Sequence, residues 1–509
     1  MTDSRTKNVL KNTRMGIIAR IAKMIVNFAL KTLFIHLLGA QYTGLSSLFT
    51  DILTFLSFAE LGIGSAITYA LYKPVAENNE KKIAELLNFY KAAYRIVALI
   101  VFVTGIVLMP FLQYIVTDVP DIKEDINLIY FLYVVNTASS YLLIYKSAIF
   151  EAKQKRSVLS IIETKVLVIR LLIEGIELAL FRQFIIYLIT DIVLNLIQNI
   201  WIAKKADREY NYKDKTAALS KNERNEIMSN IYALALYQVA FVALSSTDSI
   251  IISSMIGTEL VGFLSCYKMI YNQIISFLQQ FIYGANASVG NLVTEENTEK
   301  EYQLFKDLNF AFFVLSCFCC VCLYVLTEPF ILIWVGNSFQ LGQKVVAVLT
   351  IDFFLNVMRQ IVSMFRTANG LFVQGKFRPL IMAIINIVLS IVLAKPMGVF
   401  GVLAATVISK VLTEVWYDPY IIYKNIFKKS VKEYYWQYLK YSITIVLSCY
   451  GAYKLGEIIR IGNIYVNFIL AFLICCGLSV IVIAVFWGKT KEFRNCRERV
   501  EKIIFPKRI

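Results

Sequence analysis

Apolar runs long enough to cross a bilayer alternate along this chain with short polar segments. A hydrocarbon core of about 30 Å requires about 20 apolar residues in a helix, and about 14 segments reach that length. They lie at 15–37, 45–72, 91–116, 126–149, 158–180, 183–203, 227–256, 260–290, 307–335, 344–368, 379–395, 400–423, 436–456 and 463–487. The pattern predicts an all-α integral membrane protein with about 14 transmembrane helices.

Positive charge gathers in every second connection between these runs. Lys and Arg cluster in the first residues, at Lys73 to Lys82, at Lys204 to Arg224, at Lys424 to Lys432 and in the tail. The intervening connections are short and poor in cations, and the longest is the acidic segment from Thr117 to Asp125. Because cytoplasmic loops carry the excess of Lys and Arg, we expect a multi-pass protein of the cell (plasma or inner) membrane with both termini in the cytoplasm.

Short motifs recur at a near-constant separation of about 219 residues, which is the signature of an internal repeat. Gly39 pairs with Gly257, Pro110 with Pro329, and Gln154 with Gln374. The repeat predicts two six-helix bundles related by a pseudo-twofold axis along the membrane normal, with two extra C-terminal helices. The expected parts are an N-terminal bundle (1–203), a cytoplasmic linker (204–226), a C-terminal bundle (227–430), the two extra helices (431–487) and a basic amphipathic tail at the membrane surface (488–509).

The composition excludes several classes of function. With 58% hydrophobic and 17% charged residues the chain is far from a soluble domain, and its net charge of +16 lies in short connections and not in a nucleic-acid-binding domain. The nine cysteines lack metal-binding spacing and are expected in the core. Gly39 with Gly44, and Gly257 with Gly262, have P-loop spacing without its Lys, so both pairs are expected in tight outward turns.

A cationic stripe marks the first predicted helix. Arg20, Lys23, Asn27 and Lys31 recur at i, i+3, i+7 and i+11 among apolar residues. Charges at membrane depth are costly, so the stripe is expected to face a wet cavity or an anionic ligand. For Arg20 and Lys23, snorkelling to the lipid phosphates is an equal alternative. His36, near the outer end, is expected to be an interfacial aromatic residue and not a proton relay.

Other predicted helices carry polar stripes at helical spacing. The tenth has Asp352, Asn356, Arg359, Ser363 and Arg366; the eighth has Lys268, Asn272, Gln279, Tyr283 and Asn286; the fifth has Glu163, Arg170, Glu174 and Glu177. Substrate binding is assigned to the first-helix stripe together with Lys268, Asn272, Arg359 and Arg366. Glu60, Asp248 and Asp352 are candidates for ion coupling. Snorkelling remains an alternative for Arg366, and an ion-pair network with its own glutamates remains one for Arg170.

Two stretches carry a family resemblance. LLGAQYTGLSSL, with the FAELGIGSAITYAL that follows, and IGTELVGFLSCYKMI in the second half resemble the O-antigen and capsule type polysaccharide flippases of the multidrug/oligosaccharidyl-lipid/polysaccharide exporter superfamily. The resemblance implies a V-shaped pair of bundles that moves undecaprenyl-diphosphate-linked oligosaccharides from the cytoplasmic to the outer leaflet by alternating access. Lys31 and Arg359 would hold the diphosphate as charge-assisted donors. A polysaccharide polymerase and chain-length machinery are candidate partners.

Two rival functions remain open. One is a cation-coupled multidrug exporter of the same fold, which would require an acidic cavity. The first helix here has only cations, whereas the drug-exporting branch commonly has an acidic residue there. The other is a membrane enzyme that polymerises or transfers lipid-linked glycans, which would want a large outer loop. Neither feature is present in the sequence, so no enzyme activity, metal or cofactor is expected beyond Na⁺ or H⁺ as a candidate coupling ion.

Overall fold

The computed structural model describes residues 21–60, 62–118, 121–210, 218–294, 297–371, 374–375 and 377–504, and these ranges form helices and no strands. Arg20 of the predicted stripe lies outside them. Eight of the described helices are long and apolar enough to cross a membrane: Ile21–Leu38, Glu80–Ile115, Ile126–Lys146, Phe184–Glu209, Thr298–Trp334, Gln343–Ala368, Arg378–Phe427 and Ile464–Trp487. The all-helical membrane class is confirmed, whereas the count of about 14 spans stays a prediction. The chain forms two compact units, Met1–Gly262 and Phe263–Ile509.

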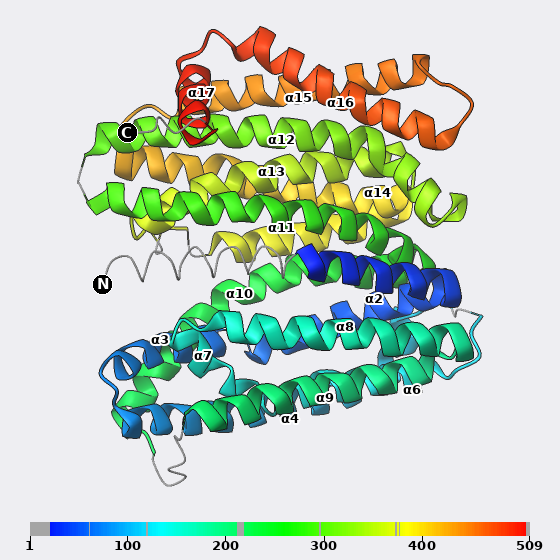
Figure 1. Cartoon of the computed structure of the whole chain (residues 1–509), viewed down its shortest axis with the longest axis vertical. Helices are drawn as coiled ribbons and strands as arrows, with labels where there is room; N and C mark the ends of the chain where they lie inside the picture. The colour runs from blue at the N-terminus through cyan, green and yellow to red at the C-terminus, as the bar shows by residue number, and fades with distance from the viewer. Residues whose placement is uncertain are drawn as a thin grey trace. The chain divides into compact units, whose positions relative to one another are not determined.

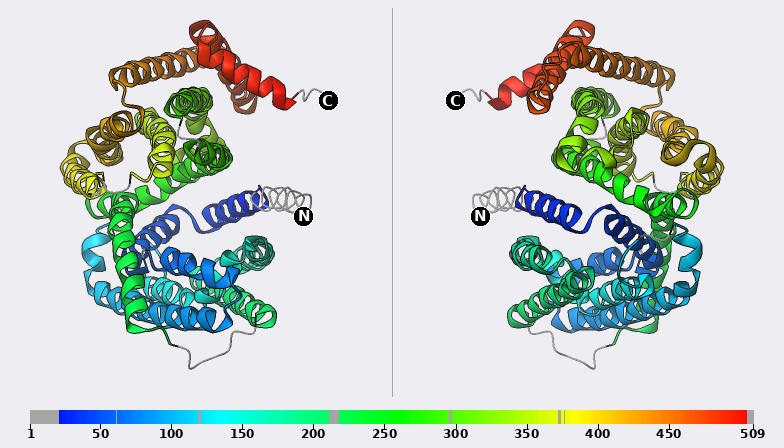
Figure 2. Two further views of the ribbon diagram at one scale, coloured as in Figure 1. Left: turned by 90° about the vertical axis from the view of Figure 1, so that its left-hand side faces the viewer. Right: turned by 90° about the vertical axis from the view of Figure 1, so that its right-hand side faces the viewer.

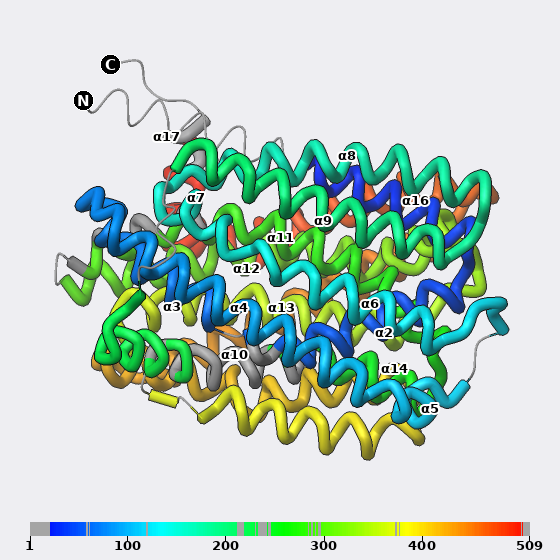
Figure 3. The backbone as a smooth tube through the Cα atoms, turned by 90° about the horizontal axis from the view of Figure 1, so that it is seen from below, coloured from blue at the N-terminus to red at the C-terminus, as the bar shows by residue number. Residues whose placement is uncertain are grey.

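Unit 1 is built from the helix Ile21–Leu38, here called the first helix, and the helices that follow it. These are α2 (Ala40–Leu56), α3 (Ile63–Ala76), α4 (Glu80–Leu108), α5 (Leu112–Ile115), α6 (Ile126–Ser140), α7 (Ala148–Ala152), α8 (Arg156–Phe181), α9 (Phe184–Glu209) and α10 (Lys221–Met255). The helices α4, α6, α9 and α8 lie side by side in that order (Figure 3). Their facing sides bury aliphatic and tyrosine side chains such as Val101 and Tyr130.

Unit 2 contains most of α11 (Thr258–Thr294) and all of α12 (Thr298–Trp334), α13 (Gln343–Ala368), α14 (Arg378–Ile422), α15 (Lys432–Ile458), α16 (Ile464–Trp487) and α17 (Lys491–Ile504). The helix α12 packs against α13, α15, α16 and α17, so it is the central helix of the unit (Figures 1 and 2). Aromatic rings fill the junction: Phe313 stacks on Tyr441 with centroids 3.9 Å apart, and Trp487 meets Phe313 edge-on. The expected core role of the cysteines agrees with the full burial of Cys317, Cys320 and Cys475.

One predicted span differs from the observed helices, and one predicted break coincides with a kink. The predicted span 45–72 is two helices, because α2 ends at Leu56 and Gly62, in the left-handed region with φ of 89°, precedes α3. The separate runs 379–395 and 400–423 agree with the structure, because Gly398 between them has non-helical angles (φ of 60°, ψ of −145°) and divides α14 by a kink. An apolar run can hide a short break such as the one at Gly62, whereas Pro396 and Gly398 mark the kink in the sequence.

The predicted glycine turns are correct for one member of each pair and wrong for the other. Gly39 takes φ of 90° between the first helix and α2, as a turn requires. Gly44 lies inside α2 and Gly262 inside α11, and they pack against each other: a Cβ on Gly262 would come 2.7 Å from the Gly44 nitrogen. These two glycines therefore allow two helices to approach closely, which is a packing role and not a turn.

The helices α10 and α17 provide information on the predicted division of the chain into bundles, linker and tail. The helix α10 packs on α2 and α3 and so belongs to unit 1, although the repeat assigns residues 227–256 to the second half. The repeat boundary itself stays a prediction. The tail helix α17 is fastened to α12, since Asn495 and Arg499 donate hydrogen bonds of 3.0 and 2.8 Å to Asp307. The tail thus has a protein contact in addition to the amphipathic face that predicted a membrane-surface position.

The predicted orientation can be tested by cysteine labelling. A cysteine replacing Asp121, in the acidic connection, is expected to react with a membrane-impermeant maleimide added outside whole cells, whereas one replacing Arg208, at the end of α9, is expected to react only after permeabilisation. Because the native cysteines lie in unit 2 and most are buried, the unaltered chain supplies the background control. Labelling in the opposite sense would invert the whole topology.

Candidate functional sites: two intramembrane polar clusters

A ladder of charged side chains joins α13 and α14 in unit 2. The α13 stripe faces Lys410, Glu414 and Asp418, which recur at i, i+4 and i+8 on α14 and so lie on one face of that helix. Each predicted charge of the stripe meets an opposite charge across the helix pair. Ionised groups at this depth are tolerated when they pair with one another in the bundle interior.

The first rung of the ladder is centred on Asp352. Its carboxylate forms an ion pair with Lys410 and accepts hydrogen bonds from Tyr271 of α11 at 2.7 Å and from Asn356 at 2.9 Å. Lys410 also donates to Asn356 at 3.2 Å. Asp352, a candidate for ion coupling, is therefore a fully bonded carboxylate whose partners come from three helices.

The far end of the ladder is a buried cluster around Asp418. Arg366 donates to Asp418 at 2.9 Å, and Arg378, at the start of α14, forms a second ion pair with the same carboxylate. Asp418 is 3% exposed and the two arginines 7% each. Other N–H groups of Arg366 donate hydrogen bonds to the carbonyl oxygens of Leu371 and Gln374. These bonds favour a packing role for Arg366, and its assignment to substrate stays a prediction.

Arg359 occupies the middle rung and differs from its neighbours. Its Nε lies 3.4 Å from Glu414, beyond good hydrogen-bond geometry, and its side chain is 32% exposed whereas that of Glu414 is 8% exposed. None of its N–H groups donates to a residue that the structure describes. Arg378 also approaches Glu414, at 4.0 Å. Arg359 is thus a guanidinium with a nearby countercharge and with its donors still available.

The sequence reasoning missed Lys410, Glu414 and Asp418. Their spacing of four residues within an apolar run was the available signal, because a stripe of that kind predicts one polar helix face. The order of charges along a single helix does not reveal their partners, since pairing depends on which helix faces pack together. The structure supplies that information and shows that the acid beside Arg359 is Glu414 and not Asp352.

In unit 1 the first helix presents three of the four predicted stripe residues. Lys23 forms an ion pair of 2.7 Å with Glu163 of α8, and both side chains are partly exposed. Asn27 is exposed. Lys31 is half-buried, with its ammonium 5.9 Å from the ring centre of Phe34. The first helix is therefore tied to α8 through Lys23, and the role of its cations toward a substrate stays a prediction.

A second polar cluster joins α6, α8 and α9. Arg170 forms an ion pair of 2.7 Å with Asp191 and donates to Asn195 at 2.7 Å. Asn136 of α6 donates to Asp191 at 2.6 Å. Arg170 therefore pairs best with an acid of α9, whereas Glu174, on its own helix, lies 3.6 Å from it.

Glu174 is the most enclosed acid of this cluster. It is 0% exposed, and neither of its carboxyl oxygens has a hydrogen bond of normal geometry within the described part of the chain. Glu177, one turn further along, accepts from Thr190 at 2.8 Å. A buried carboxyl group without a hydrogen-bond partner is costly, so Glu174 is the residue of this cluster that most needs an explanation.

The remaining predicted residues lie apart from these clusters. Glu60 accepts a hydrogen bond of 3.0 Å from Tyr94 in unit 1. Asp248 is buried in α10. On α11, Lys268 is half-buried and Asn272 exposed, while their neighbour Tyr271 is the residue that reaches the ladder. The candidate acids Glu60, Asp248 and Asp352 are thus spread over three separate places.

Comparisons with known proteins show which solved structures have a similar fold. No family model and no curated protein matches the sequence. The structure is similar to that of the lipid II flippase MurJ in an inward closed conformation, with 15% identity, a TM-score of 0.65, and coverage of 94% of this chain and 99% of that one. It is also similar to an inward-facing multidrug resistance MATE family transporter of the MOP superfamily, with 11% identity, a TM-score of 0.61, and coverage of 78% and 94%.

A third similar structure is that of the Vibrio cholerae MATE transporter VcmN, with 11% identity, a TM-score of 0.55, and coverage of 84% of this chain and 99% of that one. At such low identity these likenesses describe the fold. The likeness agrees with the fold that the resemblance implies, and membership of the O-antigen and capsule branch remains an expectation from the sequence. The chain has the fold that a lipid II flippase shares with MATE transporters.

Proposed function

We propose that this protein moves an undecaprenyl-diphosphate-linked oligosaccharide from the cytoplasmic to the outer leaflet of the cell membrane by alternating access. The observation that carries the proposal is Arg359, an intramembrane guanidinium that is one-third exposed and whose donors are not taken up by described residues. A diphosphate cannot cross hydrocarbon without replacing its hydration, and charge-assisted donors are the groups that replace it best.

The rest of the ladder supports Arg359 in this role. Glu414 and Asp352 offset the positive charge when no substrate is present, and Lys410 and Arg378 hold those acids in turn. An anion that approaches Arg359 therefore meets a guanidinium already held in position. The low-dielectric surroundings strengthen such a contact relative to water.

The unit 1 cluster supports energy coupling by protons. Glu174 sits among Arg170 and Glu177 of its own helix and Asp191 and Tyr187 of α9, and it is fully buried. An enclosed carboxyl group that gains and loses a proton changes the charge of this cluster by one unit, which can bias helix packing between two states. We assign coupling to Glu174 because Asp352, the sequence candidate, is already bonded to a lysine.

A cation-coupled multidrug exporter is the second candidate function, and the same cluster favours it. Glu174, Glu177 and Asp191 outnumber Arg170, so this part of unit 1 attracts cations. The two functions differ in the charge of the cargo: an anionic headgroup would use Arg359, whereas a cationic drug would use the acids. The two can be separated in one assay.

Reconstituted vesicles provide the test. Protein in proteoliposomes with an imposed pH gradient is expected to move an undecaprenyl-diphosphate-linked disaccharide to the opposite leaflet, measured by its accessibility to an added lectin, and to leave a lipophilic cation where it was. Glu174→Gln is expected to abolish the dependence on the pH gradient while slow downhill movement persists. Uptake of the cation without movement of the lipid would favour the exporter, and unchanged gradient dependence in Glu174→Gln would remove that residue from coupling.

A further inference from the structure

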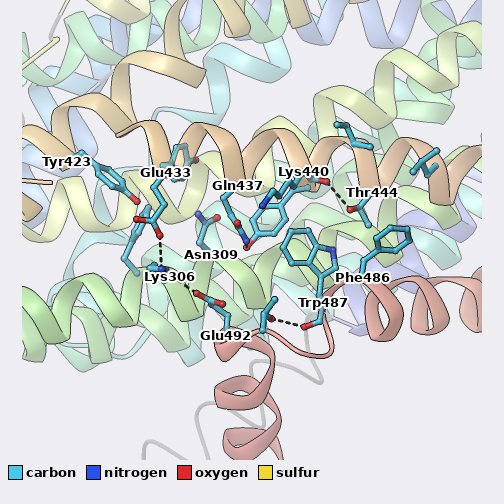
Figure 4. Close-up of a pocket in the computed structure, with 16 residues that line it drawn as sticks. Lys306, Asn309, Tyr423, Glu433, Gln437, Lys440, Thr444, Phe486, Trp487 and Glu492 are labelled. Carbon is cyan, nitrogen blue, oxygen red and sulfur yellow. Dashed lines mark hydrogen bonds and ion pairs between the residues drawn. The ribbon is translucent and has the colours of Figure 1, made fainter. Parts of the chain in front are cut away.

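A cavity of about 450 Å³ lies in unit 2, apart from the charged ladder, where α15 begins and α16 ends (Figure 4). Its walls come from the first turns of α12, the first half of α15, the end of α16 and the residues that lead into α17. The cavity therefore joins the two extra helices to the central helix α12. Its size matches that of sites for small amphiphilic molecules.

Two buried polar atoms in the wall of this cavity lack a hydrogen-bond partner among the residues that the structure describes. The Asn309 Oδ1 of α12 and the Trp487 Nε1 of α16 make no hydrogen bond with described residues, although both side chains line the cavity and each residue is only 6% exposed. A buried polar group left without a partner is costly and in a native structure calls for an explanation. One atom is an acceptor and the other a donor, so the missing partner carries both functions.

The ionised side chains at the cavity sum to zero. Lys306 lies 2.9 Å from Glu433 and 3.5 Å from Glu492, and Lys440 lies above the ring of Trp436 at 5.5 Å. The Lys306 ammonium, which donates to the Glu433 carboxylate, lowers the pKa of that carboxyl below its usual range, so Glu433 is ionised at neutral pH. The end beside Lys306 carries an excess of negative charge and the end beside Lys440 is positive. A ligand with separated charges of both signs complements this arrangement.

The remaining wall is apolar and open. Ile443, Leu447 and Phe486 line the cavity and are 50%, 53% and 60% exposed. All three lie on helices whose outward faces are apolar, so they continue the cavity into the hydrocarbon region. A ligand with a polar head and an apolar chain fits both parts at once.

We propose that this cavity binds the head group of a bilayer phospholipid that bears both a phosphate and a primary ammonium group. The phosphate accepts from the Trp487 Nε1 and from Lys440, the ammonium donates to the Asn309 Oδ1 near Glu433 and Glu492, and one acyl chain leaves past Leu447 and Phe486. The bound lipid would fasten α15 and α16 to α12. This site is separate from the proposed substrate path, so it does not depend on the identity of the cargo.

Native mass spectrometry of the full-length purified protein tests the site. Dioleoyl phosphatidylethanolamine is expected to bind at least about tenfold more tightly than dioleoyl phosphatidylcholine, because a trimethylated ammonium has no N–H to donate to Asn309. Trp487→Phe, which keeps a ring in the aromatic cluster, and Lys440→Gln, at an exposed position, are each expected to weaken binding about tenfold, as the loss of one hydrogen bond to a charged group predicts. Trp416→Phe, an exposed tryptophan away from the cavity, is expected to leave binding unchanged.

Each alternative result overturns the assignment. Equal affinity for the two lipids would mean that the site does not recognise the ammonium N–H groups. A higher affinity for dioleoyl phosphatidylglycerol would mean that the site binds an anionic head group and not a zwitterionic one. Equal affinity of Trp487→Phe and Trp416→Phe for dioleoyl phosphatidylethanolamine would mean that water, and not the lipid phosphate, accepts the hydrogen bond of the Trp487 indole. Melting curves of all variants, recorded in parallel, exclude unfolding as the cause of lost binding, and Lys440→Gln provides an independent reading if Trp487→Phe proves unstable.

Discussion

Asp418→Asn is expected to destabilise unit 2 by roughly 3–5 kcal/mol, the cost of breaking a buried ion pair from one side. The carboxylate is the shared partner of Arg366 and Arg378, and all three residues are nearly inaccessible. An asparagine of the same size removes the countercharge of Arg366 and leaves Arg378 only Glu414, at 4.0 Å. Unfolding can be followed with a thiol-reactive dye, because all the cysteines lie in unit 2 and several are buried.

Two further variants show whether the charge or the shape matters. Glu299→Gln breaks an ion pair of similar length, 2.7 Å to Lys429, at a carboxylate that is 76% exposed, and is expected to change the melting temperature very little. Asp418→Asn combined with Arg378→Met removes one of the stranded charges and is expected to recover part of the loss. A melting curve of Asp418→Asn that matches that of Glu299→Gln would show that the buried cluster contributes little to stability.

The apolar pattern predicted the helices well because each long run buries or faces lipid along its whole length. It placed α12, α13 and α16 within a few residues, apart from the polar first turns of α12, since nothing inside those runs changes the backbone. It failed at Gly62, which separates α2 from α3, because the surrounding apolar residues give no sign of that break. It succeeded at Gly398, where Pro396 and the glycine itself mark the kink that divides α14.

The sequence predicted the polar residues of each candidate site but not the residues with which they pair. The stripe on α13 was visible as a period of three and four residues, and its polar character is confirmed by the ion pairs that it makes. Its partners on α14 required knowledge of helix contacts that a single sequence does not contain. Glu174 was visible as part of a stripe, yet its complete burial depends on how α9 packs against α8, which the stripe alone does not show.

The second large effect concerns the deep cations. Arg359→Gln and Lys31→Gln are each expected to lower translocation of the lipid-linked disaccharide at least about tenfold, because each removes a charge-assisted contact worth roughly 1.5–3 kcal/mol. Lys31→Arg keeps the charge and is expected to retain part of the activity. Translocation in vesicles and protein abundance in membranes are measured side by side, with Lys454→Gln, at an exposed pair with Glu457, as the matched control.

A double variant can distinguish whether Arg359 binds substrate or only stabilises the helix pair. Its acid partner is Glu414, so the informative double variant is Arg359→Gln with Glu414→Gln, while Asp352 belongs with Lys410. If Arg359 only offsets the buried Glu414, the single variant strands that acid and lowers abundance, and the double variant restores both abundance and translocation. If Arg359 holds the diphosphate, the double variant restores abundance alone. Normal translocation in Arg359→Gln and Lys31→Gln at normal abundance would exclude both as headgroup ligands and direct attention to Lys23 and Lys268.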